Sequence, residues 1–419
     1  MACDLAVVGL GYIGLPLAQR ACAVGLSTVG YDVSAPVVEG LAAGSSHVDD
    51  VSDGEVAAMG AAGFRATTDP SVLAGAGTIV VCVPTGLSAA GDPDLDSLRA
   101  AIADVAAQLR PGTLVVVEST SHPGTTEEIV RPALERGSGL TVGEDFHLAY
   151  SPERIDPGNS SFTMSNTPRV VSGCTPLCAK HAVAFYGRLV DTVVVARGTR
   201  EAEMAKLLEN TYRYVNIALV DEVALFCDKM GIDIWDVLHC AATKPFGFTA
   251  FSPGAGVGGH CIPVDPRYLA VKAESEGFSF DMLSAARQVL GRMPRHVVQR
   301  VAGLLEAQGR PLRGARVLLL GVTYKPDIAD TRESPAFAVA ALLRAGGAHV
   351  SYHDPYVPSF DCEGTPLSRR ADLAGALADS DLALLLQDHS CYDPTLLARA
   401  QCPVLDTRGR TAGVRVTRL

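Results

Sequence analysis

The chain has 419 residues, which is enough for two to four domains of about 100–200 residues each. Its residues are 48% hydrophobic and 19% charged, a composition that supports buried cores and excludes an intrinsically disordered chain. The formal net charge is −11 and no Lys/Arg-rich block occurs, which argues against nonspecific binding to nucleic acid or to anionic membranes.

The N-terminal residues are apolar but contain no basic region, so they predict a strand, a turn and a helix and not a secretory signal. No apolar run reaches the roughly 18–20 residues of a membrane span. The 11 cysteines are scattered, odd in number and without a CxxC pair, which is typical of reduced thiols. We therefore expect a cytoplasmic protein with no membrane partner.

The first half of the chain alternates short apolar strands with helices. Predicted strands and helices are at residues 4–9, 10–25, 27–32, 78–85, 94–109 and 113–120. Strands that alternate with helices in this way predict a parallel, doubly wound sheet.

A glycine fingerprint, "GLGYIG", follows the first of these strands. Gly9 permits the tight turn, Gly11 lets a pyrophosphate approach the backbone, and Gly14 lets the helix pack closely on the sheet. Asp32 ends the next strand, 18 residues after Gly14. A carboxylate there binds the ribose hydroxyls of NAD and repels the 2′-phosphate of NADP, so the pattern predicts an NAD site.

A long helix follows over residues 199–231, which contain no proline and no glycine before Gly231. At 1.5 Å per residue it would extend for about 45 Å or more. Such a helix between two α/β regions is typical of a dimer surface, and an ordinary core helix is the alternative.

The last part of the chain returns to the α/β pattern after a linker at residues 309–314. It lacks the glycine fingerprint, so it does not predict a second dinucleotide site. Its predicted strands and one helix are at residues 316–327, 335–347, 349–358, 381–388 and 403–410. The sequence therefore predicts an α/β fold of two Rossmann-like, doubly wound domains joined by a long central helix or helical domain.

Two polar residues of the long helix, Lys206 and Asn210, are four positions apart and therefore share one helix face. A lysine charge and an amide donor suit an oxygen that becomes anionic in a transition state. The alternative for Lys206 is an ordinary solvated helix residue.

The stretch "PGAGVGGHCIPVDP" contains a cysteine, Cys261, among glycines and prolines. Glycines here, including Gly258, would remove side-chain bulk so that a substrate reaches the sulfur. Asp265, four residues on, would position a water or a proton. A thiolate next to a hydride acceptor suits the oxidation of an aldehyde to an acid through a thioester. The adjacent His260 and Cys261 lack the spacing of a zinc site, so we expect no metal.

Several motifs together resemble the UDP-glucose/GDP-mannose dehydrogenase family, from one end of the chain to the other. They are "VVGLGYIGLPLA", "VCVPTGL", "ESTSHPGTTEEIV", "AYSPERIDPGN", "EMAKLLENTYRYVNIALVDE", "GVGGHCIPVDP", "GVTYKPDIADTRESPA" and "HDPYVP". The stretches "SPERIDPGN", "TKPFGF" and "GGHCIPVDP" most resemble the branch that oxidises UDP-N-acetylhexosamines, especially UDP-N-acetylglucosamine. No arginine occurs between Thr243 and Pro266, where UDP-glucose dehydrogenases often have one.

The resemblance implies a role for each matching residue. Cys261 would be the nucleophile, Lys206 and Asn210 would stabilise the oxyanion, and Asp265, Glu153 and Thr120 would hold and activate water. The implied NAD-binding residues are Gly9, Gly11, Tyr12, Ile13, Gly14, Asp32, Cys82, Val83, Pro84, Thr85, Ser119, Thr120 and Arg332. The implied UDP-sugar-binding residues are Lys206, Asn210, Gly258, Lys325 and Arg408. For Arg332 and Arg408, a structural ion pair is the alternative.

The resemblance also implies three domains: an NAD-binding domain at residues 1–198, a central helical dimerisation domain with the cysteine loop at 199–308, and a UDP-sugar-binding domain at 309–419. We expect a homodimeric, NAD-dependent UDP-sugar 6-dehydrogenase of polysaccharide biosynthesis, with UDP-N-acetylglucosamine as the favoured substrate. UDP-glucose and, less favoured, UDP-N-acetylmannosamine stay open. Two competing hypotheses are a hydroxyacid-type dehydrogenase, which needs neither Cys261 nor a second nucleotide domain, and a non-catalytic nucleotide-binding protein.

Overall fold

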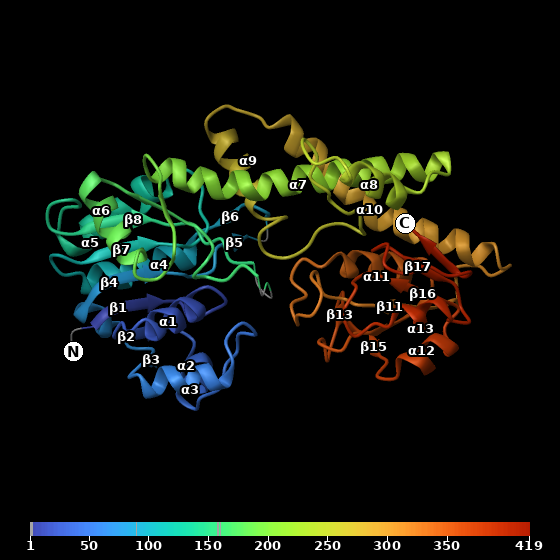
Figure 1. Cartoon of the computed structure of the whole chain (residues 1–419), viewed down its shortest axis with the longest axis horizontal. Helices are drawn as coiled ribbons and strands as arrows, with labels where there is room; N and C mark the ends of the chain where they lie inside the picture. Colours follow the sequence, from blue (N-terminus) through green and yellow to red (C-terminus); the bar gives the residue numbers. More distant parts are fainter. Residues whose placement is uncertain (1–2, 89, 157–158, 160) are drawn as a thin grey trace. The chain divides into compact units, whose positions relative to one another are not determined.

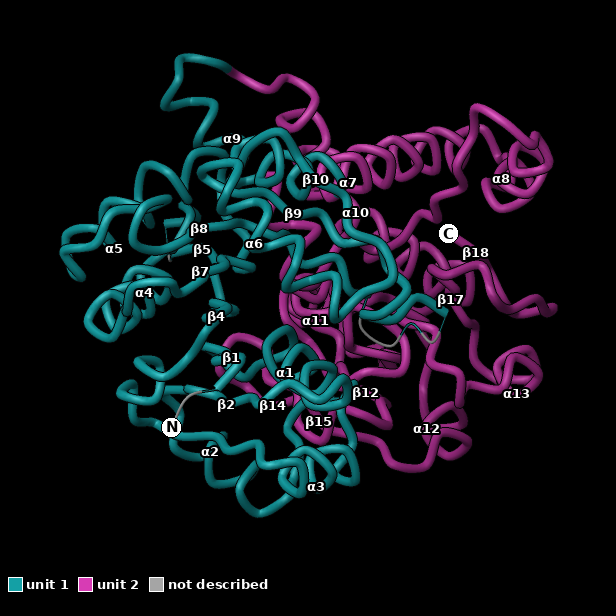
Figure 2. The backbone as a smooth tube through the Cα atoms, turned by 60° about the vertical axis from the view of Figure 1, so that its left-hand side comes forward, with its two compact units in different colours: residues 1–209, 267–278 teal, residues 210–266, 279–419 magenta. Residues whose placement is uncertain are grey.

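A computed structural model describes residues 3–88, 90–156, 159 and 161–419. Two residues of the "SPERIDPGN" motif, 157 and 158, lie outside this described part. The chain forms two compact units (Figure 2), residues 1–209 with 267–278 and residues 210–266 with 279–419. The predicted three-domain division stays a prediction.

The first unit is built on a sheet with the strand order β10-β9-β8-β7-β4-β1-β2-β3 (Figure 1). Its pairings are parallel except for β8 with β9, which run antiparallel. The strands are β1 (Cys3–Val8), β2 (Thr28–Tyr31), β3 (Arg65–Thr67), β4 (Ala76–Val81), β7 (Leu114–Val117), β8 (His147–Tyr150), β9 (Arg169–Gly173) and β10 (Val193–Val195). The strand order reverses at β1, so the gap between β1 and β4 is the place where such sheets bind ligands.

Helices and short turns connect these strands. They are α1 (Gly14–Ala23), α2 (Ala35–Ala42), α3 (Asp53–Ala61), η1 (Pro70–Gly75), α4 (Asp96–Gln108), η2 (Thr126–Val130), α5 (Arg131–Ser138) and α6 (Pro176–Tyr186), with a small hairpin of β5 (Gly86–Leu87) and β6 (Pro93–Asp94). Side chains of α1 such as Leu17 and Ala21 pack with Val7 and Val80 of the sheet in one buried cluster. Because these residues recur at helical spacing in α1 and alternate along the strands, each element buries one face.

The second unit contains a parallel sheet with the order β15-β12-β11-β16-β17-β18. The strands are β11 (Arg316–Leu320), β12 (His349–His353), β15 (Ser368–Arg369), β16 (Leu382–Leu385), β17 (Val404–Asp406) and β18 (Val416–Arg418), with a separate hairpin of β13 (Asp361–Cys362) and β14 (Thr365–Pro366). Its helices are α8 (Ile234–Ala242), α10 (Asp281–Glu306), α11 (Pro335–Ala345), α12 (Leu373–Asp379) and α13 (Pro394–Ala398).

Both faces of this second sheet are covered. Leu319 of β11 belongs to the buried cluster that includes Val297 of α10 and Val339 of α11. The next residue, Leu320, points the other way and packs with Leu377 of α12. This alternation of neighbouring apolar residues between two cores is what a doubly wound sheet requires. The predicted fold class, two Rossmann-like sheets with a long helix between them in the chain, is confirmed.

The long helix α7 (Thr199–Met230) ends one residue earlier than predicted. Gly231 follows it with φ 66°, a left-handed conformation that terminates helices and favours glycine. Both α7 and α9 (Asp265–Ser275) begin in the residues of one unit and continue into those of the other. Within the described residues, we find no helix with the length and apolar character needed to cross a membrane.

Candidate active site

The glycine fingerprint lies directly after β1 and leads into α1. Gly9 has φ 88°, and a Cβ added there would lie 2.9 Å from the carbonyl oxygen of Cys82. A Cβ at Gly14 would lie 1.8 Å from the carbonyl oxygen of Gly9, so packing alone requires both glycines. A Cβ at Gly11 would meet no atom of the described residues within 4 Å. Packing among these residues therefore does not require Gly11, and its open backbone fits the approach of a dinucleotide pyrophosphate.

Asp32 lies just beyond β2, as the NAD pattern requires. Its Oδ2 accepts a hydrogen bond from the backbone N–H of Leu10 at 2.8 Å, inside the glycine turn. Its Oδ1 accepts another from Ser34 N–H at 2.8 Å. These bonds fix the carboxylate beside the turn. The other two fingerprint residues, Tyr12 and Ile13, stand between the turn and the start of α1, and Tyr12 is exposed.

The remaining cofactor residues of the first unit follow β4 and β7, which are neighbouring strands. Ser119 Oγ donates a hydrogen bond of 2.7 Å to the carbonyl oxygen of Val83 and so ties the two strand ends together. The residues that follow these strands are Cys82, Val83, Pro84, Thr85, Ser119 and Thr120. The structure thus brings the predicted cofactor residues of this unit to the carboxyl ends of adjacent parallel strands.

Lys206 of α7 reaches the segment after β8. Its Nζ donates a hydrogen bond of 2.7 Å to the backbone carbonyl of Glu153, and both residues are buried. The Glu153 carboxylate is held on both oxygens: Oε1 accepts from the N–H groups of Arg154 at 2.7 Å and Ile155 at 2.5 Å, and Oε2 accepts from Arg169 Nη1 at 2.7 Å. The predicted catalytic residues Lys206 and Glu153 therefore lie together.

Two residues for which the motifs predict no role, Arg169 and Glu118, adjoin this pair. The Arg169 guanidinium forms an ion pair with Glu118 as well as with Glu153, and its Nε donates to Ser151 Oγ at 2.8 Å. Tyr186 donates its hydroxyl to Glu118, and its ring lies 5.1 Å from the guanidinium carbon. We call Arg169, Glu118, Glu153, Tyr186 and Ser151 the Arg169 cluster.

The two carboxyl groups of this cluster have shifted pKa values of opposite sign. Burial raises the pKa of Glu118, and the neighbouring Arg169 only partly offsets it. Burial acts on Glu153 in the same direction, but the charge and hydrogen bond of Arg169 and the Ile155 N–H outweigh it, so the pKa of Glu153 is lowered. The lowered pKa of Glu153 favours its ionised form.

In the second unit, Asn210 and Asp265 hold the cysteine loop. Asn210 Nδ2 donates a hydrogen bond of 2.5 Å to Asp265 Oδ2, and both residues are buried. The Asp265 N–H donates to the carbonyl oxygen of Cys261 at 3.0 Å, within the turn that starts α9. Cys261 itself is exposed. A buried amide–carboxylate pair thus supports a loop that presents a thiol.

The glycines beside Cys261 are also required for packing within the second unit, and their predicted role in substrate access stays a prediction. A Cβ at Gly258 would lie 2.7 Å from the carbonyl oxygen of Glu333, and one at Gly259 would lie 2.6 Å from the ring of Tyr324. Gly259 N–H also donates to the carbonyl oxygen of Arg332 at 2.9 Å. These glycines are required because the cysteine loop packs against residues 324–333, so substrate access alone does not explain them.

The other predicted residues of the second unit follow strands of its sheet. Lys325 comes after β11, where its carbonyl accepts a hydrogen bond of 2.8 Å from Thr323 Oγ1. Arg408 comes after β17, and its backbone N–H donates to Asp406 Oδ1 at 2.7 Å. The Arg332 guanidinium forms an ion pair with Asp330 at 2.6 Å. A structural ion pair of this kind is the alternative to cofactor binding that the sequence suggests for Arg332. Cofactor binding by Arg332 and substrate binding by Gly258, Lys325 and Arg408 stay predictions.

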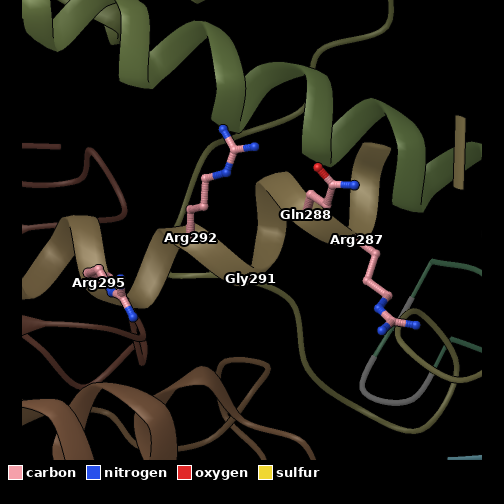
Figure 3. Close-up of a pocket in the computed structure, with 5 residues that line it drawn as sticks. All are labelled: Arg287, Gln288, Gly291, Arg292 and Arg295. Carbon is pink, nitrogen blue, oxygen red and sulfur yellow. The ribbon is translucent and has the colours of Figure 1, made fainter. Parts of the chain in front are cut away.

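A surface hollow of about 380 Å³ lies on α10 (Figure 3). It is lined by Arg287, Gln288, Gly291, Arg292 and Arg295. All five are exposed, and Figure 3 shows Arg292 pointing away from α10 on the opposite side from Arg287 and Arg295. Because none of the predicted catalytic or binding residues lines it, we do not assign the hollow to the active site.

Comparisons with known proteins agree with this arrangement of motifs. Residues 3–190 match the NAD binding domain of the UDP-glucose/GDP-mannose dehydrogenase family, residues 200–290 match its central domain, and residues 318–412 match its UDP binding domain. The chain belongs to the UDP-glucose/GDP-mannose dehydrogenase family. It is therefore an NAD-dependent nucleotide-sugar dehydrogenase with a UDP-sugar substrate, and the family predicted from the sequence motifs is confirmed.

Relatives within the family differ in the substrate that their names give. The chain is 35% identical to a UDP-N-acetyl-D-mannosamine dehydrogenase of Pyrococcus horikoshii, over 92% of this chain and 89% of the relative. It is 37% identical to a UDP-N-acetyl-D-glucosamine 6-dehydrogenase of Pseudomonas aeruginosa, over 85% and 84%. The structure of a UDP-D-ManNAc dehydrogenase from Pyrococcus horikoshii superimposes with a TM-score of 0.89 at 32% identity, covering 99% of this chain and 98% of that chain.

Proposed function

We propose that this dehydrogenase oxidises the C6 alcohol of UDP-N-acetylglucosamine to the carboxylate, with two NAD⁺ per sugar and a covalent Cys261 thioester. The observation that carries the proposal is the support of the Cys261 loop: an exposed thiol stands on a turn that the buried Asn210–Asp265 pair holds in place. A preorganised thiol in an NAD-dependent dehydrogenase suits the capture of an aldehyde before its second oxidation.

The overall reaction converts the alcohol, two NAD⁺ and one water into the carboxylate, two NADH and three protons. When bound, NAD accepts a hydride from C6 at each oxidation. As the C6 hydroxyl loses its proton, the donors on Lys206 and Asn210 stabilise the negative charge on its oxygen. This first oxidation leaves an aldehyde at C6.

The Cys261 thiolate then forms a C–S bond with the aldehyde carbon and gives a thiohemiacetal, whose oxidation leaves a thioester. Water breaks this C–S bond, releases the carboxylate and restores the thiol. Glu153, Asp265 and Thr120 are assigned to hold that water and to take its proton. The lowered pKa of Glu153 supports an ionised carboxylate for this step, while its two occupied oxygens favour an orienting role over a large movement.

Two further groups of residues complete the proposal. The glycine turn, Asp32 and the ends of β4 and β7 bind NAD, with Arg332 as an additional contact. Lys325, Arg408 and Gly258 bind the UDP-sugar. Lys325 and Arg408 suit its diphosphate, because a cationic side chain is the usual partner of a phosphate.

The identity of the sugar rests on sequence motifs and relatives. The stretches "SPERIDPGN" and "TKPFGF" and the 37% identity to a glucosamine enzyme favour UDP-N-acetylglucosamine. UDP-N-acetylmannosamine is the second candidate. A UDP-N-acetyl-D-mannosamine dehydrogenase matches 92% of this chain, against 85% for the UDP-N-acetyl-D-glucosamine enzyme, and the structure of a UDP-D-ManNAc dehydrogenase superimposes with a TM-score of 0.89. These sugars differ at C2, where one or two contacts decide specificity.

The test is a panel of UDP-N-acetylglucosamine, UDP-N-acetylmannosamine, UDP-glucose, UDP-galactose and GDP-mannose, followed by NADH absorbance. We expect the highest kcat/KM with UDP-N-acetylglucosamine and two NADH per molecule of sugar. One NADH per sugar would instead support a two-electron hydroxyacid-type reaction. In parallel, Cys261→Ala should abolish acid formation, while Cys240→Ala, a change at another exposed cysteine, should not. Acid formation at the wild-type rate by Cys261→Ala would overturn the thioester mechanism.

We also propose that the protein is a homodimer through α7. Five apolar side chains on the part of α7 in the second unit are 37–60% exposed, and their spacing of seven, four, three and four residues places them on one helix face. They are Tyr212, Leu219, Val223, Phe226 and Met230. An apolar stripe of this kind is typical of an interface between two copies of a chain.

A further inference from the structure

The register of one antiparallel strand pair places Arg169 at the carboxyl edge of the first unit's sheet. Tyr150 of β8 is opposite Ser172 of β9, so three further residues along the same register bring Glu153 opposite Arg169. Arg169 is the first residue of β9. If β9 ran parallel to β8, its first residue would lie at the other edge of the sheet. The one antiparallel pairing in this sheet, among the described residues, therefore places a cation where the neighbouring strands end.

At that edge, the three nitrogen atoms of the Arg169 guanidinium contact three different residues. It pairs with Glu118 just after β7, binds Glu153 at 2.7 Å after β8, and donates to Ser151 Oγ at 2.8 Å. All four side chains are buried. The planar guanidinium fork can satisfy several acceptors at once, which a lysine ammonium on its flexible chain does less well.

The second carboxylate of the cluster has hydrogen-bond donors on both oxygens as well. Glu118 accepts from the Tyr186 hydroxyl and, through Oε2, from Cys82 Sγ at 3.7 Å. A buried ion pair is weak evidence for stability, because desolvation of the two charges offsets their attraction. A well-connected buried network is, however, an effective way to fix the position of its members.

The cluster touches both groups of residues that the proposed reaction uses. Cys82, adjacent to Glu118 in space, and Ser119, adjacent to it in sequence, are predicted NAD-binding residues. At the other end, the backbone carbonyl of Glu153 accepts the hydrogen bond of 2.7 Å from Lys206 Nζ. A shift of Arg169 would therefore move Glu153, and with it the position of the Lys206 ammonium.

We propose that Arg169, together with Glu118, is a positioning residue of the oxidation: it fixes Glu153, and through the Glu153 carbonyl the Lys206 ammonium, relative to the NAD-binding ends of β4 and β7. This role rests on the proposed function. Neither Arg169 nor Glu118 reacts with substrate in it. The cluster acts by holding the two groups that stabilise charge and orient water in the geometry the reaction needs.

The experiment compares Arg169→Lys and Tyr186→Phe with the wild-type enzyme. Arg169→Lys keeps the positive charge but cannot bridge Glu118, Glu153 and Ser151, so we expect kcat to fall by about 100-fold, with little change in the KM for NAD. Tyr186→Phe removes one hydrogen bond to Glu118, and we expect a fall of about tenfold. Each kcat is expressed per folded enzyme, from circular dichroism and the melting temperature.

Glu209→Gln is the matched control. It breaks the ion pair of 2.7 Å between Glu209 and Arg154, which lies next to Glu153 in the sequence but outside the Arg169 cluster. Its kcat should equal that of the wild type. If Arg169→Lys does not fold, Tyr186→Phe and Glu118→Gln decide, since both preserve the shape of the cluster.

The outcomes separate this role from the proposed function. A wild-type enzyme that forms no NADH with any of the sugar nucleotides overturns the proposed function and the positioning role that rests on it. An active wild type whose folded Arg169→Lys, Tyr186→Phe and Glu118→Gln variants all keep its kcat overturns the positioning role alone. A loss of activity that is fully explained by a smaller folded fraction also overturns it, because a purely structural role predicts that result.

Discussion

The side-chain amide nitrogen of Asn210 lies 2.5 Å from Oδ2 of Asp265, and this buried bond joins α7 to the first residue of α9. The Asp265 N–H in turn donates to the carbonyl oxygen of Cys261. The amide of Asn210 therefore supports the cysteine loop and is also one of the proposed donors to the C6 oxygen. The amide of asparagine has two N–H groups, so one side chain can support the loop and also donate to the C6 oxygen.

Replacement of Asn210 by alanine should lower kcat by about 100-fold, the usual effect of removing one donor to a developing oxyanion. The KM for NAD should change little, because the glycine turn and Asp32 are untouched. The measurement is steady-state NADH formation with UDP-N-acetylglucosamine.

Asn216→Ala supplies the control for this change. Asn216 is on the same helix, and its amide donates to the carbonyl oxygen of Tyr212, one turn away. We expect wild-type kcat for Asn216→Ala. Equal activity of the two variants would contradict the role of Asn210.

The sequence predicts those parts of the site that depend on local chain geometry. The turn at Gly9, Gly11 and Gly14 connects a strand to a helix over a few residues, so its pattern specifies both the fold and the dinucleotide. Likewise, the four-residue spacing of Lys206 and Asn210 depends only on the helix to which both belong.

The sequence does not predict the parts that depend on tertiary pairing. Arg169 stands as a lone basic residue before an apolar run, and it gains its role only through the antiparallel register of β8 and β9. Gly258 and Gly259 are visible in the sequence, but their packing against Tyr324 and Glu333 depends on a loop more than 60 residues further along the chain. Glu118 is visible in the sequence as an acidic residue directly after a buried strand, and this pattern alone could have marked it as a residue at the carboxyl edge of the sheet.

Asp32→Asn should weaken the preference of the enzyme for NAD over NADP. Asparagine keeps an oxygen that can accept from the Leu10 N–H but loses the charge that repels a 2′-phosphate. We expect the ratio of kcat/KM for NAD to that for NADP to fall by about tenfold, the effect of about 1.4 kcal/mol in differential binding.

The measurement for Asp32→Asn is the initial rate with each cofactor at a fixed UDP-sugar concentration. Asp69→Asn is a control at an exposed carboxylate after β3, and it should leave the ratio unchanged. A ratio that does not move in Asp32→Asn would exclude Asp32 as the selector of the cofactor.

The dimer proposal predicts that a charge within the exposed stripe of α7 separates the two copies. Phe226 and Leu219 are 60% and 56% exposed, so glutamate at either position should fold within a single chain but oppose burial against a partner. Sedimentation velocity should show a dimer for the wild type and a monomer for Phe226→Glu.

Val194→Glu tests whether any new surface charge has this effect. Val194 is 47% exposed on β10, outside α7, and its replacement should leave the dimer intact. A wild-type protein that sediments as a monomer at micromolar concentration would contradict the dimer, and a dimeric Phe226→Glu would place the interface elsewhere.

Asp221, a buried residue of α7, should make the protein less stable as the pH rises. Its Oδ1 accepts the Gly254 N–H at 2.9 Å, but its Oδ2 has no hydrogen-bond partner among the described residues. Burial raises the pKa of Asp221 from 3.8 to about 7, against the opposing effects of the Gly254 N–H and the charge of Arg408. Between about pH 4 and pH 7 the native protein therefore holds a proton that the unfolded chain has lost, so stability from this group falls across that window.

Asp221→Asn removes the titration and keeps an acceptor for the Gly254 N–H. As the pH rises from 4 to 7, the free energy of unfolding of the variant should increase relative to that of the wild type. The increase should reach up to about 4 kcal/mol, the equivalent of three pKa units. Urea unfolding of both proteins at pH 4, 5, 6, 7 and 8 measures this difference, and other titrating groups cancel because both proteins share them. Asp236→Asn, at an exposed residue of α8, is the control for the change from aspartate to asparagine itself. A flat difference for Asp221→Asn would show that the Asp221 carboxyl is already ionised at pH 5, because Arg408 then compensates its burial in full.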